Sequence, residues 1–309
     1  MGTDAGGHPR YPKSAASNLH YLLTERAPAK INLTLHITGR RADGFHSLES
    51  LVAFSRAGDT VTLAPGEALT LSVEGPSAAA SGSVKDNLIL GAARHFAERF
   101  PSAKLGAFHL VKCLPVAAGI GGGSSDAAAA LRLLARANAL SFDDPRLMEA
   151  AKATGADVPV CVARRGRMMR GVGDELGPPL AIPPLVALLV NPGVEVETKK
   201  VFARMNIAPG AAPDIGAHPR IEPKIEADAL IAALRKARND MEAAACLLAP
   251  VIGDVLAVLA AAPGCRLARM SGSGATCFAL FPSCRSAARA RKAILRAHPE
   301  WWAKISLLN

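Results

Sequence analysis

A run of small residues carries the clearest chemical signal in the sequence. Residues 115–130 read PVAAGIGGGSSDAAAA, in which glycines and serines lie between an apolar stretch and an alanine-rich one. Because glycine has no side chain, backbone N–H groups here can approach an anion closely, and a helix starting here adds about half a positive charge. The hydroxyls of Ser124 and Ser125 could bond phosphate oxygens or a magnesium ion. The segment therefore predicts a phosphate-binding loop.

Three common glycine motifs do not describe this loop. Walker A requires a Gly-Lys pair, which occurs nowhere in the chain. The dinucleotide fingerprint G-x-G-x-x-G fails because Ser124 follows Gly123, and the nucleophile elbow G-x-S-x-G is absent. The structural alternative is a tight turn whose glycines only solve a packing problem. Three consecutive glycines cost folding entropy, which disfavours that alternative.

The loop needs a strand before it and a helix after it, and periodicity predicts both. Alternating or short apolar runs favour strands over residues 21–38, 47–55, 59–65 and 107–115. Helical spacing covers residues 87–100, with Asp86 or Asn87 as the cap, and residues 126–140, with Asp126 in the first turn. The loop is therefore expected at a strand-to-helix connection.

A second set of elements follows a proline-rich stretch. GPPLAIPP marks a domain boundary near residue 179, and PLVALLVNP after it is a short buried strand. Further along, we expect a surface loop over 207–223, two Ala/Leu-rich helices, a strand–glycine turn–strand unit over 266–281 and a basic amphipathic helix over 286–297. This mixture predicts an α+β fold rather than a doubly wound parallel sheet.

Composition narrows the class of protein. The formal charge is 36 − 26 = +10, but the basic residues are scattered, which favours an arginine-rich composition over a nucleic-acid or membrane partner. The six cysteines form no C-x-x-C pair and no zinc-like spacing, as expected of reduced thiols in a cytoplasmic protein. Residues 1–20 have no apolar signal-peptide core and are predicted to be a disordered tail. The run 180–190 is too short to span a bilayer.

The glycine loop resembles the phosphate loop of the GHMP kinases, the superfamily of galactokinase, homoserine kinase and mevalonate kinase. Two further segments match family motifs in the same order, APAKINLTLHITGRRADGFHSLES near the start and RMSGSGATCFALF near the end. Additional matches are GADVPVC, NPGVEVETKKVF and NDMEAA, so the resemblance spans residues 28–281. It is nearest to the branch that phosphorylates a cytidine-diphosphate-linked methylerythritol in non-mevalonate isoprenoid biosynthesis.

The resemblance implies an ATP-dependent small-molecule kinase with a two-domain GHMP-kinase-like fold. Residues 21–179 would form the N-terminal nucleotide-binding domain and residues 180–309 the C-terminal substrate domain, with the active site in the cleft between them. Lys30 and Asp157 fall on the family's active-site lysine and aspartate. Taken alone, Lys30 could be an edge-strand lysine, and Asp157 a cap or turn residue after a helix and before an apolar strand.

The resemblance also assigns the phosphate site. The residues that would bind ATP are Pro115, Val116, Ala117, Ala118, Gly119, Ile120, Gly121, Gly122, Gly123, Ser124 and Ser125. Gly272, Ser273 and Gly274 belong to a second glycine loop that would pack beside the phosphates. Magnesium is expected because ATP carries it, and Ser125 falls on a serine that contacts the metal in several relatives.

A cytosine base requires flat rings and a group that reads its hydrogen-bonding edge. Phe45 and Phe202 fall on the family's stacking positions, and His46 on the histidine that reads the edge. Asn32 and Thr198 match polar residues at the methylerythritol end and the base end. Without the resemblance, the Phe-His pair would more simply be a turn with a core aromatic. Asn239 and Asp240 are interpreted as supporting residues of a helix start.

Two alternatives remain open from the sequence. One is another GHMP kinase, acting on homoserine, mevalonate or a sugar alcohol without a cytidyl group, and DGFH and GVEVETKKVF oppose it. The other is an RNA-binding module, which the glycine loop and the absence of a dense basic stripe oppose. A nucleotide sensor without catalysis is disfavoured by Lys30 and Asp157. We expect a small-molecule substrate, no nucleic acid, no membrane, and a monomer or homodimer.

Overall fold

The structure is a computed structural model that describes residues 22–213 and 216–309. The predicted tail, residues 1–20, lies outside these ranges. Eleven strands are described: β1 (Leu23–Asn32), β2 (His36–Arg40), β3 (His46–Ala64), β4 (Thr70–Glu74), β5 (Ala107–Val111), β6 (Arg167–Arg170), β7 (Glu175–Pro179), β8 (Leu185–Asn191), β9 (Leu267–Met270), β10 (Cys277–Phe281) and β11 (Trp302–Leu308). All of them connect into one sheet.

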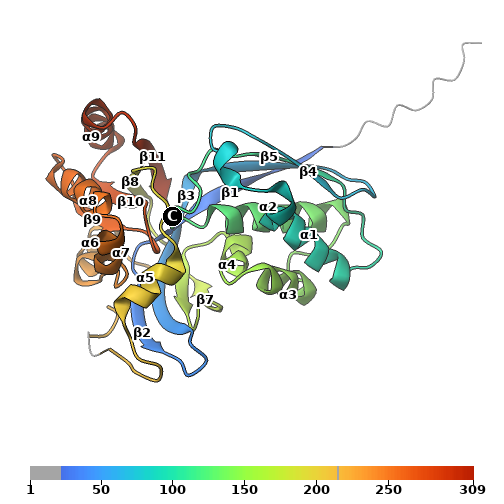
Figure 1. Cartoon of the computed structure of the whole chain (residues 1–309), viewed down its shortest axis with the longest axis horizontal. Coiled ribbons are helices and arrows are strands. Elements are labelled where there is room, and N and C mark those ends of the chain that lie inside the picture. Colours follow the sequence, from blue (N-terminus) through green and yellow to red (C-terminus); the bar gives the residue numbers. More distant parts are fainter. Residues whose placement is uncertain (1–21, 214–215) are drawn as a thin grey trace, which may run out of the picture.

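The helices are α1 (Leu88–Arg99), α2 (Gly122–Ala137), α3 (Pro145–Thr154), α4 (Val158–Ala163), α5 (Thr198–Met205), α6 (Ala227–Lys236), α7 (Glu242–Leu248), α8 (Val251–Ala261) and α9 (Cys284–Ala297), with short 3-10 turns at Ala79–Ser81 and Val84–Asp86. Figure 1 shows α1 to α4 beside β1, β3, β4 and β5, and α6 to α9 at the opposite end of the molecule beside β8 to β11. None of the helices that the structure describes is long and apolar enough to cross a bilayer.

The long strand β3 organises the sheet. It pairs with β1, β2, β5 and β6, and at its middle it meets β11, the last strand of the chain, through Ser55 and Leu308. Pairings are antiparallel apart from β4 with β5. The sequence predicted two separate strands over 47–55 and 59–65, but the chain stays extended through Gly58. Its missing side chain allows this, since a Cβ there would lie 2.5 Å from the carbonyl oxygen of Ala27.

Apolar side chains form three buried clusters. One lies between α1–α4 and the strands β1, β3 and β5, and a second lies under α5, α7, α8 and α9. The third includes Ile31 and Leu51 from the first half of the chain and Leu189 and Phe278 from the second half. The two halves are therefore joined by a continuous apolar core as well as by the sheet. The predicted α+β class is confirmed.

Several predicted elements are found and others differ. Helix α1 is capped by Asn87, which accepts a 3.0 Å hydrogen bond from the N–H of Ile89, as predicted. Helix α2 begins at Gly122 instead of Asp126, because packing against α1 and β1 offsets the low helix propensity of glycine, about 1 kcal/mol per residue.

Two elements contradict their sequence interpretation. The apolar stretch after Asp157 is the short helix α4 and not a strand, since proline in the first turn favours a helix start. Strand β11, residues 302–308, was not predicted at all, although it lies between β3 and β8 in the sheet. Of the predicted loop over 207–223, residues 214–215 are not described, and the rest has no helix or strand.

Candidate active site

One cavity of about 720 Å³ collects most of the predicted site residues. Its lining includes both predicted catalytic residues, Lys30 and Asp157, and all five predicted substrate residues, Asn32, Phe45, His46, Thr198 and Phe202. From the phosphate loop it includes Pro115, Val116, Ala117, Ala118, Gly119, Gly121, Gly122, Gly123 and Ser124. Ile120 and Ser125 are buried and do not line it, and Gly272 and Ser273 do while Gly274 does not.

Lys30 and Asp157 form an ion pair at the wall of this cavity. Their Nζ and Oδ2 atoms are 2.7 Å apart, and the side chain of Lys30 is 5% exposed while that of Asp157 is 38% exposed. Lys30 lies on β1 at a bulge, where its N–H donates to the carbonyl of Ile120 at 2.9 Å. Asp157 precedes α4 and caps no backbone N–H. Its carboxylate is therefore held by one cation and remains open to the cavity.

The phosphate loop is shaped by glycines in the left-handed region. Gly119 and Gly121 have φ of 71° and 60°, and Gly121 is the residue that precedes α2. A Cβ on Gly121 would lie 3.2 Å from Cε of Lys30, so the lysine stem runs directly along the loop. The first residues of α2, Gly122 to Ser124, line the same cavity as the Lys30–Asp157 pair, and the start of a helix is where backbone N–H groups are free to bind an anion.

The second glycine loop interlocks with the first. A Cβ on Gly119 would lie 2.4 Å from the carbonyl oxygen of Ser271, and one on Gly272 would lie 2.6 Å from that of Gly119. The hydroxyl of Ser271 donates to the Gly119 carbonyl at 3.0 Å and accepts from the N–H of Asn32 at 3.1 Å. Ser271 was missed by sequence reasoning, although it opens the predicted SGSG turn. It ties β1 and both loops together.

Asn239 holds the second glycine loop in place through hydrogen bonds to its backbone. Its Nδ2 donates to the carbonyls of Met270 and Gly272 at 2.9 and 2.8 Å, and its Oδ1 accepts from the N–H of Met241. Asp240 accepts from the N–H of Ile37 at 2.7 Å. Both residues contact backbone, in line with their interpretation as supporting residues.

The two loop serines have different surroundings. The hydroxyl of Ser125 donates to the carbonyl of Pro28 at 2.6 Å and lies 3.4 Å from Sγ of Cys161, with the residue 1% exposed. It is therefore bonded to protein and turned away from the cavity. Ser124, one residue earlier on the helix, lines the cavity. Ser125, the predicted metal ligand, therefore does not line the cavity.

At the other end of the cavity an imidazole and a phenyl ring are stacked. The rings of His46 and Phe202 are parallel within 9° with centroids 4.3 Å apart, whereas Phe45 is 63% exposed. Phe45 and Phe202 therefore do not leave a gap for a base between them, because the ring of His46 lies on the face of Phe202. Burial, followed by the charge of Arg40, lowers the pKa of His46 and so favours the neutral imidazole.

Buried polar atoms without partners mark the same region. Among the residues that the structure describes, Nε2 of His46 has no hydrogen-bond partner, and neither has Oδ1 of Asn32, whose Nδ2 donates to Ser50 at 2.7 Å. Thr198 and Ser273 share a hydrogen bond of 2.8 Å between their hydroxyls. Unpaired buried polar atoms are uncommon in proteins, so these two are candidates for ligand contacts.

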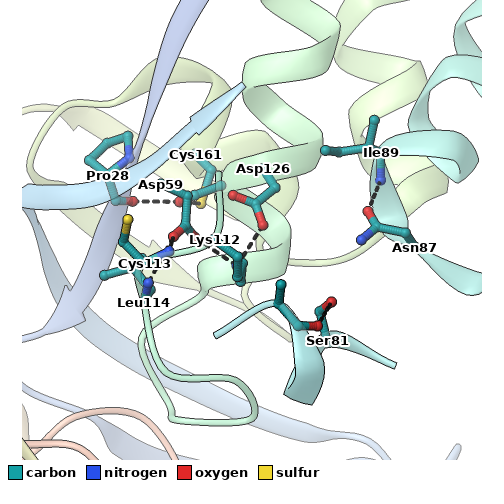
Figure 2. A network of polar contacts seen from close by, with 12 residues as sticks. Pro28, Asp59, Ser81, Asn87, Ile89, Lys112, Cys113, Leu114, Asp126 and Cys161 are labelled. Atoms are coloured by element: carbon teal, nitrogen blue, oxygen red, sulfur yellow. Dashed lines mark hydrogen bonds and ion pairs between the residues drawn. The ribbon is translucent and has the colours of Figure 1, made fainter. Parts of the chain in front are cut away.

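Sequence reasoning also missed a cluster of three charged residues beside the loop, of which Lys112 and Asp126 line the cavity and Asp59 does not. Nζ of Lys112 lies 2.7 Å from Oδ2 of Asp59 and 2.6 Å from Oδ2 of Asp126, and these side chains are at most 5% exposed (Figure 2). Burial opposes the charge of Lys112, but Asp126 and Asp59 together raise its pKa above the ordinary value. The sequence offered one indication of this cluster: Asp59 and Lys112 are each the single charged residue in a stretch predicted to be an apolar strand.

Comparison with known proteins identifies the family. The model of the GHMP kinases N terminal domain matches residues 87–165, and that of the GHMP kinases C terminal matches residues 223–300. A homoserine kinase from Cytophaga hutchinsonii shares the fold, with a TM-score of 0.64 at 19% identity over 92% of this chain and 94% of that one.

Two relatives that are more similar to this chain have the same name. The 4-diphosphocytidyl-2-C-methyl-D-erythritol kinase of Xanthobacter autotrophicus is 59% identical, over 93% of this chain and 99% of its own, and that of Methylorubrum extorquens is 57% identical, over 91% and 97%. A crystal structure of 4-(cytidine 5'-diphospho)-2C-methyl-D-erythritol kinase has a TM-score of 0.72 at 33% identity, covering 93% of this chain and 99% of that one. The chain therefore belongs to the GHMP kinases and, within them, to the family of 4-diphosphocytidyl-2-C-methyl-D-erythritol kinases.

Proposed function

We propose that this chain transfers the γ-phosphoryl group of ATP to the 2-hydroxyl of 4-diphosphocytidyl-2-C-methyl-D-erythritol, giving the 2-phosphate and ADP. The observation that carries the proposal is the Lys30–Asp157 ion pair, whose half-open carboxylate shares one cavity with the glycine loop. The 52–59% identity to kinases of this name supports the choice of substrate. The cavity takes lining residues from both sides of residue 179, which supports an active site between the two domains.

Asp157 would act on the acceptor hydroxyl. Its carboxylate orients the hydroxyl, whose oxygen attacks the γ-phosphorus while the bond to the bridging oxygen of the β-phosphate breaks and ADP leaves. The hydroxyl proton passes to Asp157. Lys30, fixed by burial and by the bulge of β1, holds the carboxylate in place and faces the charge that develops on the transferred group. The tertiary acceptor is a weakly acidic nucleophile, so positioning and charge must supply most of the rate.

The phosphate loop would hold the triphosphate through backbone N–H groups at the start of α2. Magnesium belongs to the proposal as the cation that ATP carries. Among the described residues, no three His, Cys, Asp or Glu side chains form a metal-binding group. Hard cations of this kind are then held mostly by phosphate and water oxygens. We propose the hydroxyl of Ser124 as the protein oxygen that faces the cation, in place of Ser125, whose hydroxyl is already bonded to Pro28.

The cytidyl group would bind at the end of the cavity that holds His46 and Phe202. Phe202 provides a flat face, and the unpaired Nε2 of His46 provides a polar atom for the edge of the base. A base stacked on Phe202 requires the imidazole to move from that face, and the exposed ring of Phe45 could then cover the base from the other side. Base–aromatic stacking contributes ~1–3 kcal/mol per base.

The test is an assay of ADP release with magnesium, ATP and three acceptors: the cytidyl substrate, mevalonate and homoserine. Turnover should be confined to the cytidyl substrate. Phe202→Ala should raise KM for it about 5- to 150-fold, which corresponds to the stacking energy. Phe142→Ala, at an exposed phenylalanine outside the cavity, is the matched control and should leave KM unchanged. Turnover of homoserine or mevalonate instead would overturn the assignment of the substrate.

A further inference from the structure

The cluster beside the phosphate loop connects the strand that enters it with the helix that leaves it. Asp59 lies on β3, Lys112 directly follows β5, and Asp126 lies in the second turn of α2. One ammonium bonds both carboxylates, at 2.7 and 2.6 Å, and Figure 2 shows Lys112 between them. The two ends of the loop are therefore fixed to the same strand of the sheet through a single side chain.

Asp59 also bonds the backbone at the loop's entrance. The pairing of β5 with β3 ends at Val111 opposite Thr60, and the next N–H, that of Lys112, donates to the carbonyl of Glu74. The following two N–H groups, of Cys113 and Leu114, both donate to Oδ1 of Asp59, at 2.6 and 2.8 Å. The carboxylate thus accepts backbone hydrogen bonds just after the chain has left the sheet.

The loop itself leaves little space for this arrangement to change. A Cβ on Gly122 would lie 3.3 Å from Nζ of Lys112 and 3.9 Å from Oδ2 of Asp59, so the first residue of α2 packs directly on the ion cluster. The cavity extends along the loop from Gly121, which contacts the stem of Lys30, to Lys112 and Asp126, which also line it. A displacement of Lys112 would therefore move the N–H groups that are proposed to bind phosphate. Asp59 is fully buried and does not line the cavity.

We propose that Asp59 is a positioning residue for ATP: by bonding Lys112 and the N–H groups of Cys113 and Leu114, it sets the geometry of the phosphate loop and so the affinity for the triphosphate, without touching the nucleotide. The inference rests on the proposed kinase function. The change in ATP affinity that it predicts for a neutral residue at position 59 is opposite to the change expected from charge alone. Replacing Asp59 by Asn removes one negative charge from beside an anion site, which by charge alone would tighten the binding of ATP.

The experiment compares wild type, Asp59→Asn and Glu25→Gln. Glu25 also forms a largely buried ion pair, with Arg132, and does not line the cavity, so its variant controls for a general loss of stability. Calorimetry with a non-hydrolysable ATP analogue and magnesium gives nucleotide affinity directly, and steady-state kinetics gives KM for both substrates. Asp59→Asn should weaken binding of the analogue at least 10-fold and raise KM for ATP by a similar factor. KM for the cytidyl substrate should stay within twofold of wild type. Glu25→Gln should change neither.

Unchanged or tighter binding of the analogue by Asp59→Asn would overturn the inference, and so would an equal rise of both KM values. If Asp59→Asn does not fold, Asp126→Asn replaces it. That variant keeps an oxygen for Lys112 at the other end of the loop but changes a residue that lines the cavity, so it tests the cluster as a whole; it should weaken binding of the analogue about 3- to 10-fold. An unchanged affinity there would count equally against the inference. A wild type that binds the analogue but phosphorylates no cytidyl substrate would instead remove the proposed function alone.

Discussion

Two lysines with carboxylate partners lie on either side of the phosphate loop, and they differ in exposure. Lys30 contacts Gly121 and pairs with one carboxylate, Asp157, which is 38% exposed. Lys112 lies beside Gly122 and pairs with two carboxylates that are 0% and 3% exposed. The chemical groups are the same, and Lys112 and Asp126 also line the cavity, but only the first pair has a carboxylate that is more than 3% exposed. Exposure of the carboxylate, and not the ion pair itself, separates a catalytic candidate from a structural one.

The largest effect is expected from replacing the two lysines by methionine. Lys112→Met removes the cation that bonds the buried side chains of Asp59 and Asp126 and should lower the free energy of unfolding by roughly 3–5 kcal/mol. Lys30→Met frees a carboxylate that water can reach and should cost about 1 kcal/mol or less. Urea unfolding of both variants measures the difference. Equal losses would remove the distinction between the two clusters.

The same pair of variants should differ in the opposite sense in catalysis. Lys30→Met removes the charge beside the transferred group, so kcat should fall about 10²- to 10³-fold. Lys112→Met should act mainly on KM for ATP, through the loop. Rates at saturating ATP, below the unfolding temperature of each variant, separate the two effects.

A second difference should appear in the pH dependence of stability. Burial, together with the charge of Asp59, raises the pKa of Asp126 from 3.8 to about 8, although Lys112 acts against the shift. Between these values the unfolded chain has lost this proton and the folded chain keeps it, so the free energy of unfolding falls as pH rises, by up to ~1.4 kcal/mol per pH unit from this group.

Asp126→Asn removes that contribution. Unfolding of wild type and variant from pH 5 to pH 8 should therefore show the variant gaining stability relative to wild type as pH rises. A constant difference across this range would mean that Asp126 is ionised in the folded protein.

The smallest effect concerns the two glycines that separate the clusters. Gly121 has a φ of 60° and a Cβ would crowd the stem of Lys30, so Gly121→Ala should cost about 1–2 kcal/mol and lower kcat. Gly122 is helical, where alanine is favoured by about 1 kcal/mol, but a Cβ would lie 3.3 Å from Nζ of Lys112; these effects oppose each other, so Gly122→Ala should change stability by less than about 1 kcal/mol. Thermal unfolding and turnover of both variants test this order, and a larger loss at Gly122 would reverse it.

These residues also show what the sequence could predict. Lys30, Asp157 and the two glycine loops were found because they lie in motifs whose order alone identifies a GHMP kinase. The different surroundings of Ser124 and Ser125 could not be predicted, because α2 begins four residues earlier than expected and includes both serines in its first turn. The Asp59–Lys112–Asp126 cluster depends on the register of β3 with β5, in which Thr60 lies opposite Val111, and local patterns do not contain that register.

The stacking of His46 on Phe202 was missed for a related reason. Phe45 and His46 are adjacent, so the sequence assigns both to the same ligand site, but only the backbone direction at the start of β3 decides which ring reaches Phe202. Strand β11 and helix α4 were missed because short apolar runs fit either type of element until their neighbours are known.

The most direct measurement is turnover and nucleotide binding of Asp157→Asn. The variant keeps the shape of the side chain and lies outside the phosphate loop, so affinity for the ATP analogue should stay within about threefold of wild type. Loss of the carboxylate should lower kcat for the cytidyl substrate about 10²- to 10⁴-fold. A variant that turns over within tenfold of wild type would show that the open carboxylate beside Lys30 does not carry the reaction.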